Sequence, residues 1–241
     1  MQGRGIQVVA FDMDGVLTVN TSSWELLHKC MGTHPSLKAC RFSEAFLRGL
    51  ITYEDWMRLD LEIMMSSYGG SINIGELRRR LISNLKLDPD ARYVINKLRS
   101  AGVKVYIVSA GIDVVAKYLA SELGLSNDEV FVNKLVSKHD GDLMPYGVGI
   151  VNPLRKYEIL ERISHLLNIP LSDFAYVGDT SWDLNAFRVV GYPILYVRDL
   201  MRRFGHSDEE EIHNILIPGM VIITKLSELI DIIEKVNDTK L

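Results

Sequence analysis

The chain has 241 residues, of which 47% are hydrophobic and 24% are charged, and its net charge is −4. Its length and composition are those of a soluble protein with one large domain or a core with an insertion, and the charge gives no reason to expect a nucleic acid partner. No apolar stretch is long enough to cross a membrane, and the short N-terminus leaves no room for a signal peptide, so we expect a cytoplasmic protein.

An apolar run over residues 6–11 ends at Asp12 and Asp14. Such a run is typical of a strand buried on both faces of a parallel sheet, and the ligands of these sheets lie at the carboxyl ends of the strands. Two neighbouring carboxylates repel each other unless one is protonated or a cation lies between them. The pair therefore indicates a Mg²⁺ site with a carboxylate nucleophile, and an acidic turn after a strand is the alternative.

Residues 18–87 have the periodicity of helices, whereas the chain on both sides alternates between strand and helix patterns. We therefore expect an inserted α-helical cap over 18–87 and an α/β core formed by 1–17 and 88–241. Thr52 and Asp55 predict an N-terminal cap for one helix. The predicted cap helices cover 24–31, 43–48, 53–65 and 75–85.

Cys30 and Cys40 lie close in sequence to His28 and His34. Their spacing does not match the ligand pairs of common zinc sites. Reduced cysteines in a helical segment are therefore favoured over a metal site.

From residue 88 onward, the alternation of strands and helices predicts a parallel, doubly wound sheet. Asp88 and Pro89 predict the start of a helix that runs to residue 100, and 140–141 predict a hairpin turn. Residues 198–217 are charged and irregular, with a solvated helix start over 208–211. Strands are expected over 103–108, 130–136, 174–177, 193–197 and 221–224, and helices from about 112 and over 154–167, 183–190 and 226–236.

Two further predicted strands end in small or acidic residues, at 109–111 and 178–179. Because parallel strands bring their carboxyl ends to one edge, Ser109 and Asp179 can meet the residues of 12–14. A serine hydroxyl and free N–H groups leading into a helix form a cradle for phosphate. The alternatives are a plain helix cap for Ser109 and a turn after a strand for Asp179.

Lys156 lies near the start of a predicted helix, where its charge opposes the helix dipole. A functional role of Lys156 would explain this unfavourable position. The alternative is an ordinary surface lysine without such a role. Arg155 is its competitor for a cationic role.

Together these segments resemble the four motifs of the haloacid dehalogenase-like (HAD) phosphohydrolase superfamily, in the same order along the chain. The motifs correspond to 12–14, Ser109, Lys156 and 178–183. Within this superfamily, the chain most resembles the phosphoserine phosphatases. Members of that subgroup carry a helical cap after the first motif and a strand hairpin before the motif lysine, and residues 130–151 resemble that hairpin. The resemblance implies a Rossmann-like core with a cap.

The resemblance also implies the catalytic roles. Asp12 attacks phosphorus and becomes an aspartyl-phosphate, while Asp14 protonates the leaving group and then activates water. Lys156 balances the charge of the nucleophile and the phosphoryl group. Asp183 orients Lys156 or a water on the metal.

Binding roles follow from the same resemblance. Mg²⁺ is expected on Asp12, on the backbone carbonyl of Asp14 and on Asp179. The substrate phosphate is expected to be held by Ser109, the Ala110 amide and the Lys156 side chain.

The chain departs from the phosphoserine phosphatases around the substrate. In that subgroup a glutamate soon after the first motif binds the substrate amine, whereas here no acid occurs before Glu25. Where the subgroup has a cap arginine that binds the substrate carboxylate, this chain has Asp60, with Arg58 nearby. Trp182 replaces a usual asparagine. The resemblance therefore does not support phosphoserine as the substrate.

Aromatic and basic residues of the predicted cap have two interpretations. Trp24 and Trp56 line a substrate pocket or, as is more common for buried aromatics, pack the cap helices together. Arg48 and Arg58 bind a substrate anion or, more commonly, lie on a solvated face.

We predict a Mg²⁺-dependent phosphatase that hydrolyses a small phosphomonoester through an aspartyl-phosphate. A phosphomutase of the same superfamily and a catalytically silent binding or regulatory protein are the alternatives. The expected partner is a small phosphorylated metabolite, with no nucleic acid and no membrane, and a homodimer is left open.

Overall fold

The computed structural model describes residues 5–34, 40–198 and 215–238. Their strands form one seven-stranded sheet in the order β4-β3-β2-β1-β5-β6-β7. Every neighbouring pair is parallel except β3 and β4, which form an antiparallel hairpin. The strands are β1 (Val8–Phe11), β2 (Lys104–Ile112), β3 (Val130–Ser137), β4 (Leu143–Val148), β5 (Phe174–Gly178), β6 (Tyr192–Tyr196) and β7 (Val221–Ile223). This topology confirms the predicted α/β class and its doubly wound sheet.

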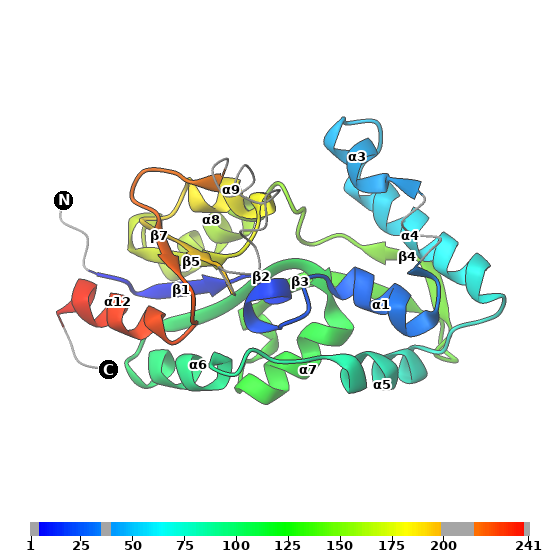
Figure 1. Cartoon of the computed structure of the whole chain (residues 1–241), viewed down its shortest axis with the longest axis horizontal. Helices are drawn as coiled ribbons and strands as arrows, with labels where there is room; N and C mark the ends of the chain where they lie inside the picture. Colours follow the sequence, from blue (N-terminus) through cyan, green and yellow to red (C-terminus); the bar gives the residue numbers. More distant parts are fainter. Residues whose placement is uncertain (1–4, 35–39, 199–214, 239–241) are drawn as a thin grey trace.

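Helices cover both faces of the sheet (Figure 1). Along the central strand β1, Val9 and Phe11 belong to one apolar cluster and Val8 and Ala10 to the other, so the strand is buried on both faces. The first cluster lies against α6 (Ala91–Ser100), α7 (Asp113–Leu123) and α12 (Glu228–Asn237), and the second against α8 (Lys156–Leu167) and α9 (Leu184–Phe187). Short 3-10 turns at Asn127–Glu129, Leu171–Asp173 and Ser181–Asp183 join these elements.

Between the tight turn η1 (Met13–Leu17) and α6, the described chain is helical. The helices are α1 (Ser23–Met31), α3 (Phe42–Leu47), α4 (Tyr53–Tyr68) and α5 (Ile74–Asn84). The predicted capping box of Thr52 and Asp55 opens α4. The chain enters and leaves this insertion side by side, because Thr18 and Leu87 form an antiparallel bridge. The inserted helical cap is thus confirmed, and its boundaries at 18 and 87 stay a prediction.

The helical insertion shares its apolar core with the α/β part. Buried side chains of α1, α4 and α5, such as Leu27, Leu61 and Leu81, belong to the same cluster as Phe11 of β1. Helix α4 packs against β4 of the hairpin. The insertion therefore rests on the sheet through a continuous apolar contact, which positions α4 above the strand ends.

Some expected boundaries were wrong. Helix α6 begins at Ala91, and Asp88 accepts a hydrogen bond from the Asp90 backbone instead of capping a helix that starts at Pro89. Strand β2 continues through the segment 109–111 to Ile112. Helix α8 begins at Lys156 instead of 154, and the helix expected over 183–190 is a 3-10 turn followed by the short α9.

None of the described helices has the length and apolar character needed to span a bilayer. The helix start expected over 208–211 lies outside the described residues.

Candidate active site

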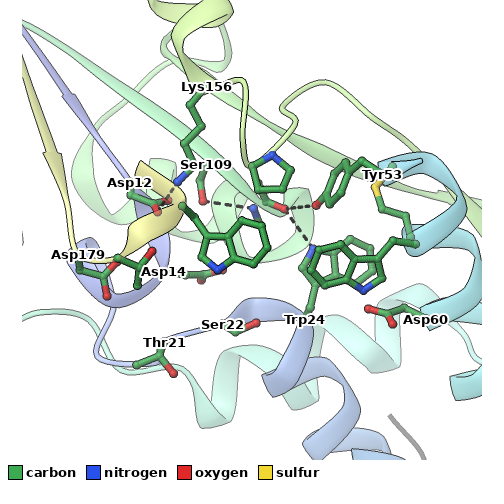
Figure 2. A pocket seen from close by; sticks show the side chains of 17 residues that line it. Asp12, Asp14, Thr21, Ser22, Trp24, Tyr53, Asp60, Ser109, Lys156 and Asp179 are labelled. Atoms are coloured by element: carbon green, nitrogen blue, oxygen red, sulfur yellow. Dashed lines mark hydrogen bonds and ion pairs between the residues drawn. The ribbon is translucent and has the colours of Figure 1, made fainter. Parts of the chain in front are cut away.

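The neighbouring strands β2, β1 and β5 end around one cavity of about 230 Å³ (Figure 2). Its lining includes Asp12 and Asp14 after β1, Ser109 on β2, Lys156 at the start of α8 and Asp179 after β5. Residues that are far apart in sequence therefore meet at the sheet edge where ligands of parallel sheets lie. Helix α4 and the start of α1 close the other side of the cavity.

Asp12 is held in place by its own turn and by a buried cation. Its Oδ1 accepts a hydrogen bond from the Met13 backbone at 2.7 Å, and its Oδ2 lies 2.6 Å from Lys156 Nζ. Burial raises the pKa of the Asp12 carboxyl above its usual value, although the Lys156 ammonium opposes this shift. Asp12 is therefore a fixed, desolvated carboxylate whose charge is offset by one ammonium group.

Lys156 is buried between two carboxylates. Its Nζ lies 2.6 Å from Asp12 Oδ2 and 2.6 Å from Asp183 Oδ1. Burial alone would lower the pKa of Lys156, but the two carboxylates outweigh that effect and raise it, so the side chain stays charged. Arg155 is exposed and pairs with Glu158, so it does not compete for this position.

Asp183 contacts Lys156 and closes the turn after β5. Its Oδ1 accepts hydrogen bonds from Lys156 and from the Tyr176 hydroxyl at 2.8 Å. Its Oδ2 accepts from the backbone N–H groups of Asp179 and Thr180 at 3.1 and 3.2 Å. A side chain at Gly178 would collide with it, because a Cβ there would lie 2.5 Å from Asp183 Cγ.

One cluster of carboxylates fits a divalent cation. Asp12, Asp179 and Asp183 are buried and each offers an oxygen, all within 4.8 Å of one another. Oxygen ligands of this kind suit a hard cation, and the negative charge exceeds that of the one ammonium beside it. Four donors already engage the two oxygens of Asp183, which leaves this carboxylate little capacity for a metal. The Asp14 carboxylate does not belong to this cluster. Metal binding by the Asp14 backbone carbonyl stays a prediction.

Gly15 lets the chain turn closely past this cluster. Its φ is +78°, a conformation that other residues rarely adopt, and a Cβ there would lie 2.1 Å from Asp179 Oδ2. The glycine after the first motif therefore has two independent reasons for its lack of a side chain.

Asp14 has the environment of a carboxyl group that can give and take a proton. Its Oδ2 accepts hydrogen bonds from the backbone N–H and the hydroxyl of Ser23 at 2.8 and 2.7 Å, and its Oδ1 is buried without a hydrogen-bond partner. Burial raises the pKa of Asp14 to about 7, against the lowering effect of the Ser23 hydrogen bonds. A pKa near neutrality suits a general acid that later acts as a base.

Ser109 and Ala110 lie at the bend of β2 beside Asp12. Ser109 is buried, and its Oγ accepts a hydrogen bond from the Gly111 backbone at 3.2 Å. The Ala110 carbonyl accepts hydrogen bonds from Trp24 Nε1 at 3.1 Å and from the Tyr53 hydroxyl at 2.9 Å (Figure 2). These bonds fix the bend, and the expected phosphate contacts of Ser109 and the Ala110 amide stay predictions.

The residues of this cavity also lie within a match to a known protein family. The model for haloacid dehalogenase-like hydrolases matches residues 9–188, which include every motif of the cavity. The chain belongs to this family. This HAD protein is therefore an enzyme, a phosphohydrolase, as predicted.

Relatives of this HAD hydrolase include phosphoserine phosphatases. The enzyme of Methanocaldococcus jannaschii is 26% identical over 191 residues, which cover 79% of this chain and 85% of the relative. The phosphoserine phosphatase of Drosophila melanogaster is 22% identical over 199 residues, which cover 81% of this chain and 70% of the relative. A solved structure of a substrate-bound phosphoserine phosphatase complex has a TM-score of 0.72 at 22% identity and covers 95% of this chain and 98% of that chain, which shows the shared fold.

The HAD hydrolase has aromatic residues of both cap and core along the cavity. Trp24, Tyr53, Trp56 and Trp182 all line it. Trp56 packs against Phe46 within the cap at a ring distance of 5.5 Å and against Trp182 of the core at 6.0 Å. Both interpretations of the tryptophans therefore apply, because they pack the helices and also face the cavity.

The basic cap residues lie elsewhere. Arg58 pairs with Glu62 at 2.7 Å on a partly exposed face of α4, and Arg48 is exposed. Neither lines the cavity, in agreement with the solvated-face interpretation.

The histidines and cysteines of the cap make separate contacts. His28 contacts Thr33, His34 contacts Glu25, and Cys30 contacts the Arg80 carbonyl.

Asn133 on β3 was missed by the sequence analysis. Its side-chain amide donates hydrogen bonds to the carbonyls of Ala110 and Val151 and to the Tyr53 hydroxyl, at 2.9, 3.0 and 3.1 Å. Its Oδ1 accepts from the backbone N–H of Ile150 at 2.7 Å. Asn133 thus joins the cap, the bend of β2 and the loop before α8, and no motif or periodicity in the sequence marks it.

Proposed function

We propose that this HAD hydrolase is a Mg²⁺-dependent phosphatase that hydrolyses a small phosphomonoester through an aspartyl-phosphate on Asp12. The observation that carries the proposal is that Asp12 is paired with the Lys156 ammonium and shares its cavity with Asp14, whose carboxyl pKa is raised to about 7. A nucleophile, a charge partner and a proton donor thus line one cavity. The substrate is a small phosphorylated metabolite.

The proposed reaction has two steps. In the first, an Asp12 oxygen bonds to phosphorus, the bond from phosphorus to the leaving oxygen breaks, and Asp14 gives that oxygen its proton. In the second, Asp14 takes a proton from a water molecule, which bonds to phosphorus and releases inorganic phosphate and the Asp12 carboxylate. The first step deprotonates Asp14 and the second reprotonates it, so the full cycle returns Asp14 to its starting state. Lys156 offsets the charge of Asp12 and of the phosphoryl group throughout.

We assign Mg²⁺ to the carboxylates of Asp12 and Asp179, with Asp183 close by and the Asp14 backbone carbonyl as a further ligand. Bound there, Mg²⁺ would offset negative charge on the phosphoryl oxygens. Ser109 and the Ala110 amide are assigned to the substrate phosphate because they border the cavity next to Asp12. The cytoplasmic location stays a prediction, and the sequence and the structure leave the oligomeric state open.

The test is phosphate release from p-nitrophenyl phosphate with Mg²⁺ and with EDTA. We expect EDTA to abolish turnover and Asp12→Asn to lower it by at least about 1000-fold, because the amide is a poor nucleophile. Asp231→Asn is the matched control, because that aspartate is exposed on α12 far from the cavity. Equal activity of Asp12→Asn and the wild type would refute the mechanism.

The same assay separates the alternatives. A phosphomutase would return the phosphoryl group to a sugar phosphate and release little inorganic phosphate. A catalytically silent binding protein would release none from any phosphoester.

A further inference from the structure

We propose that Asp60 binds a protonated amine on the leaving group of the substrate, so that the preferred substrates are aminoalkyl phosphomonoesters without a carboxylate. This inference rests on the phosphatase function proposed above. It adds the chemical class of the substrate and a residue that selects it.

Asp60 lies on α4 at the end of the cavity that is remote from the reacting groups. Figure 2 shows it on the side opposite Asp12, Asp179 and Lys156, beyond the indole of Trp24. Its side chain is buried, with 4% of the residue exposed, and its Oδ1 has no hydrogen-bond partner. A phosphoryl group bound at Asp12 would direct its leaving group along the cavity toward this carboxylate.

Among the described residues, no cation pairs with the Asp60 carboxylate to compensate its charge. Of the described residues that line the cavity, Lys156 is the single basic one. Its ammonium group is held between the carboxylates of Asp12 and Asp183. Arg58 on the same helix binds Glu62 outside the cavity. A buried carboxylate without a cation is costly, and this burial raises the pKa of Asp60 to about 7, against the lowering effect of a Trp56 hydrogen bond. A substrate ammonium group would supply both the missing charge and the missing N–H donor.

The walls around Asp60 also favour a cation. Trp24, Tyr53, Trp56 and Trp182 present aromatic rings to the cavity, and aromatic faces attract ammonium groups. Asp60 is 4% exposed, and such burial strengthens the attraction of its carboxylate for a cation and its repulsion of an anion. A carboxylate on the leaving group would therefore be rejected. The volume of about 230 Å³ limits the substrate to a small molecule.

The test compares the wild-type enzyme on four series of phosphomonoesters of equal chain length. These are ω-aminoalkyl, n-alkyl, ω-hydroxyalkyl and ω-carboxyalkyl phosphates with two to five carbons, at a pH where the amine is protonated. We expect kcat/KM for the best aminoalkyl phosphate to exceed that of the alkyl and hydroxyalkyl phosphates of the same length by at least about tenfold, with the carboxyalkyl phosphates slowest. Equal values for the amino and hydroxy series, or a preference for the carboxy series, would overturn the proposal.

Asp60→Asn tests the residue itself, because it removes the charge and keeps the size. We expect the ratio of kcat/KM between aminoalkyl and alkyl phosphates to fall to about one. Glu62→Gln is the matched control, since Glu62 lies on the same helix with 43% of its side chain exposed, and it should keep the wild-type ratio. A variant that folds, as judged by circular dichroism, and still prefers the amine would overturn the role of Asp60.

The wild-type series also separates the two proposals. If p-nitrophenyl phosphate is hydrolysed but no amine preference is found, the substrate class is wrong and the phosphatase function stands. If no phosphoester is hydrolysed, the proposed function fails and the inference about Asp60 fails with it.

Discussion

Arg198 Nη2 lies 2.7 Å from the buried Oδ2 of Asp88, at the place where the chain enters and leaves the helical insertion. The same guanidinium donates hydrogen bonds to the carbonyls of Val16 and Thr18 at 3.1 and 3.0 Å. Asp88 follows the second connection, and Val16 and Thr18 belong to the first. Arg198 at the end of β6 therefore ties both connections of the cap to the sheet.

Replacing this arginine should destabilise the protein more than a surface ion pair would. We expect Arg198→Met to lower the free energy of unfolding by about 3 kcal/mol, because it leaves the Asp88 carboxylate buried without its cation. Arg155→Met is the control and should cost less than about 1 kcal/mol, because its pair with Glu158 is exposed. Urea denaturation measures both values, and an equal cost for the two variants would contradict the role of Arg198.

Lys156→Met should abolish most of the activity. Without the ammonium, the carboxylates of Asp12 and Asp183 face each other and the phosphoryl charge is no longer offset, so we expect turnover of p-nitrophenyl phosphate to fall by at least about 1000-fold. Arg155→Met, one residue earlier and exposed, should stay close to the wild type. A loss of less than tenfold in Lys156→Met would show that the buried ammonium does not assist the reaction.

Asp179→Asn should weaken metal binding without the need for an activity measurement. Asp179 offers an oxygen to the cluster with Asp12, and an amide oxygen carries no charge to attract a divalent cation. We expect the Kd for Mg²⁺ in isothermal titration to rise by at least about tenfold. Asp231→Asn should leave it unchanged, and an unaltered Kd in Asp179→Asn would place the metal elsewhere.

The strand ends could be predicted because their signals are local. The apolar run before Asp12 and the alternation of strands and helices bring Ser109 and Asp179 to the sheet edge of Asp12 by topology alone. Lys156 lies at a helix start, and only its motif placed it with them. The resemblance to the HAD motifs then singled out these residues among many polar ones.

The partners of these residues could not be predicted, because their contacts form only in the packed fold, between positions that no sequence pattern pairs. Ser23 binds Asp14 across the start of α1, and Asn133 binds Ala110 across two strands. Asp88 looked like a helix cap from its neighbours, but Arg198, 110 residues further on, takes its carboxylate. Such pairs depend on the packed fold and leave no periodic or spacing pattern.

His28 should make the stability of the protein depend on pH. It is buried on α1, its Nδ1 lies 2.9 Å from Thr33 Oγ1, and its Nε2 has no partner. Burial, with a contribution from the charge of the nearby His34, lowers the pKa of His28 to about 4. In the unfolded chain the pKa of a histidine is about 6.5, so between these values the unfolded state binds the proton and the folded state does not.

The stabilisation from neutral His28 is therefore present above pH 6.5 and is lost as the pH falls toward 4. We expect this residue to reduce the free energy of unfolding by about 2 kcal/mol between pH 7 and pH 5. Urea denaturation of wild type and His28→Asn at both pH values isolates this effect, because other titrating groups are common to the two proteins. His139→Asn, at an exposed position, should keep the wild-type pH dependence. An equally steep loss of stability in His28→Asn would mean that other groups control the acid sensitivity.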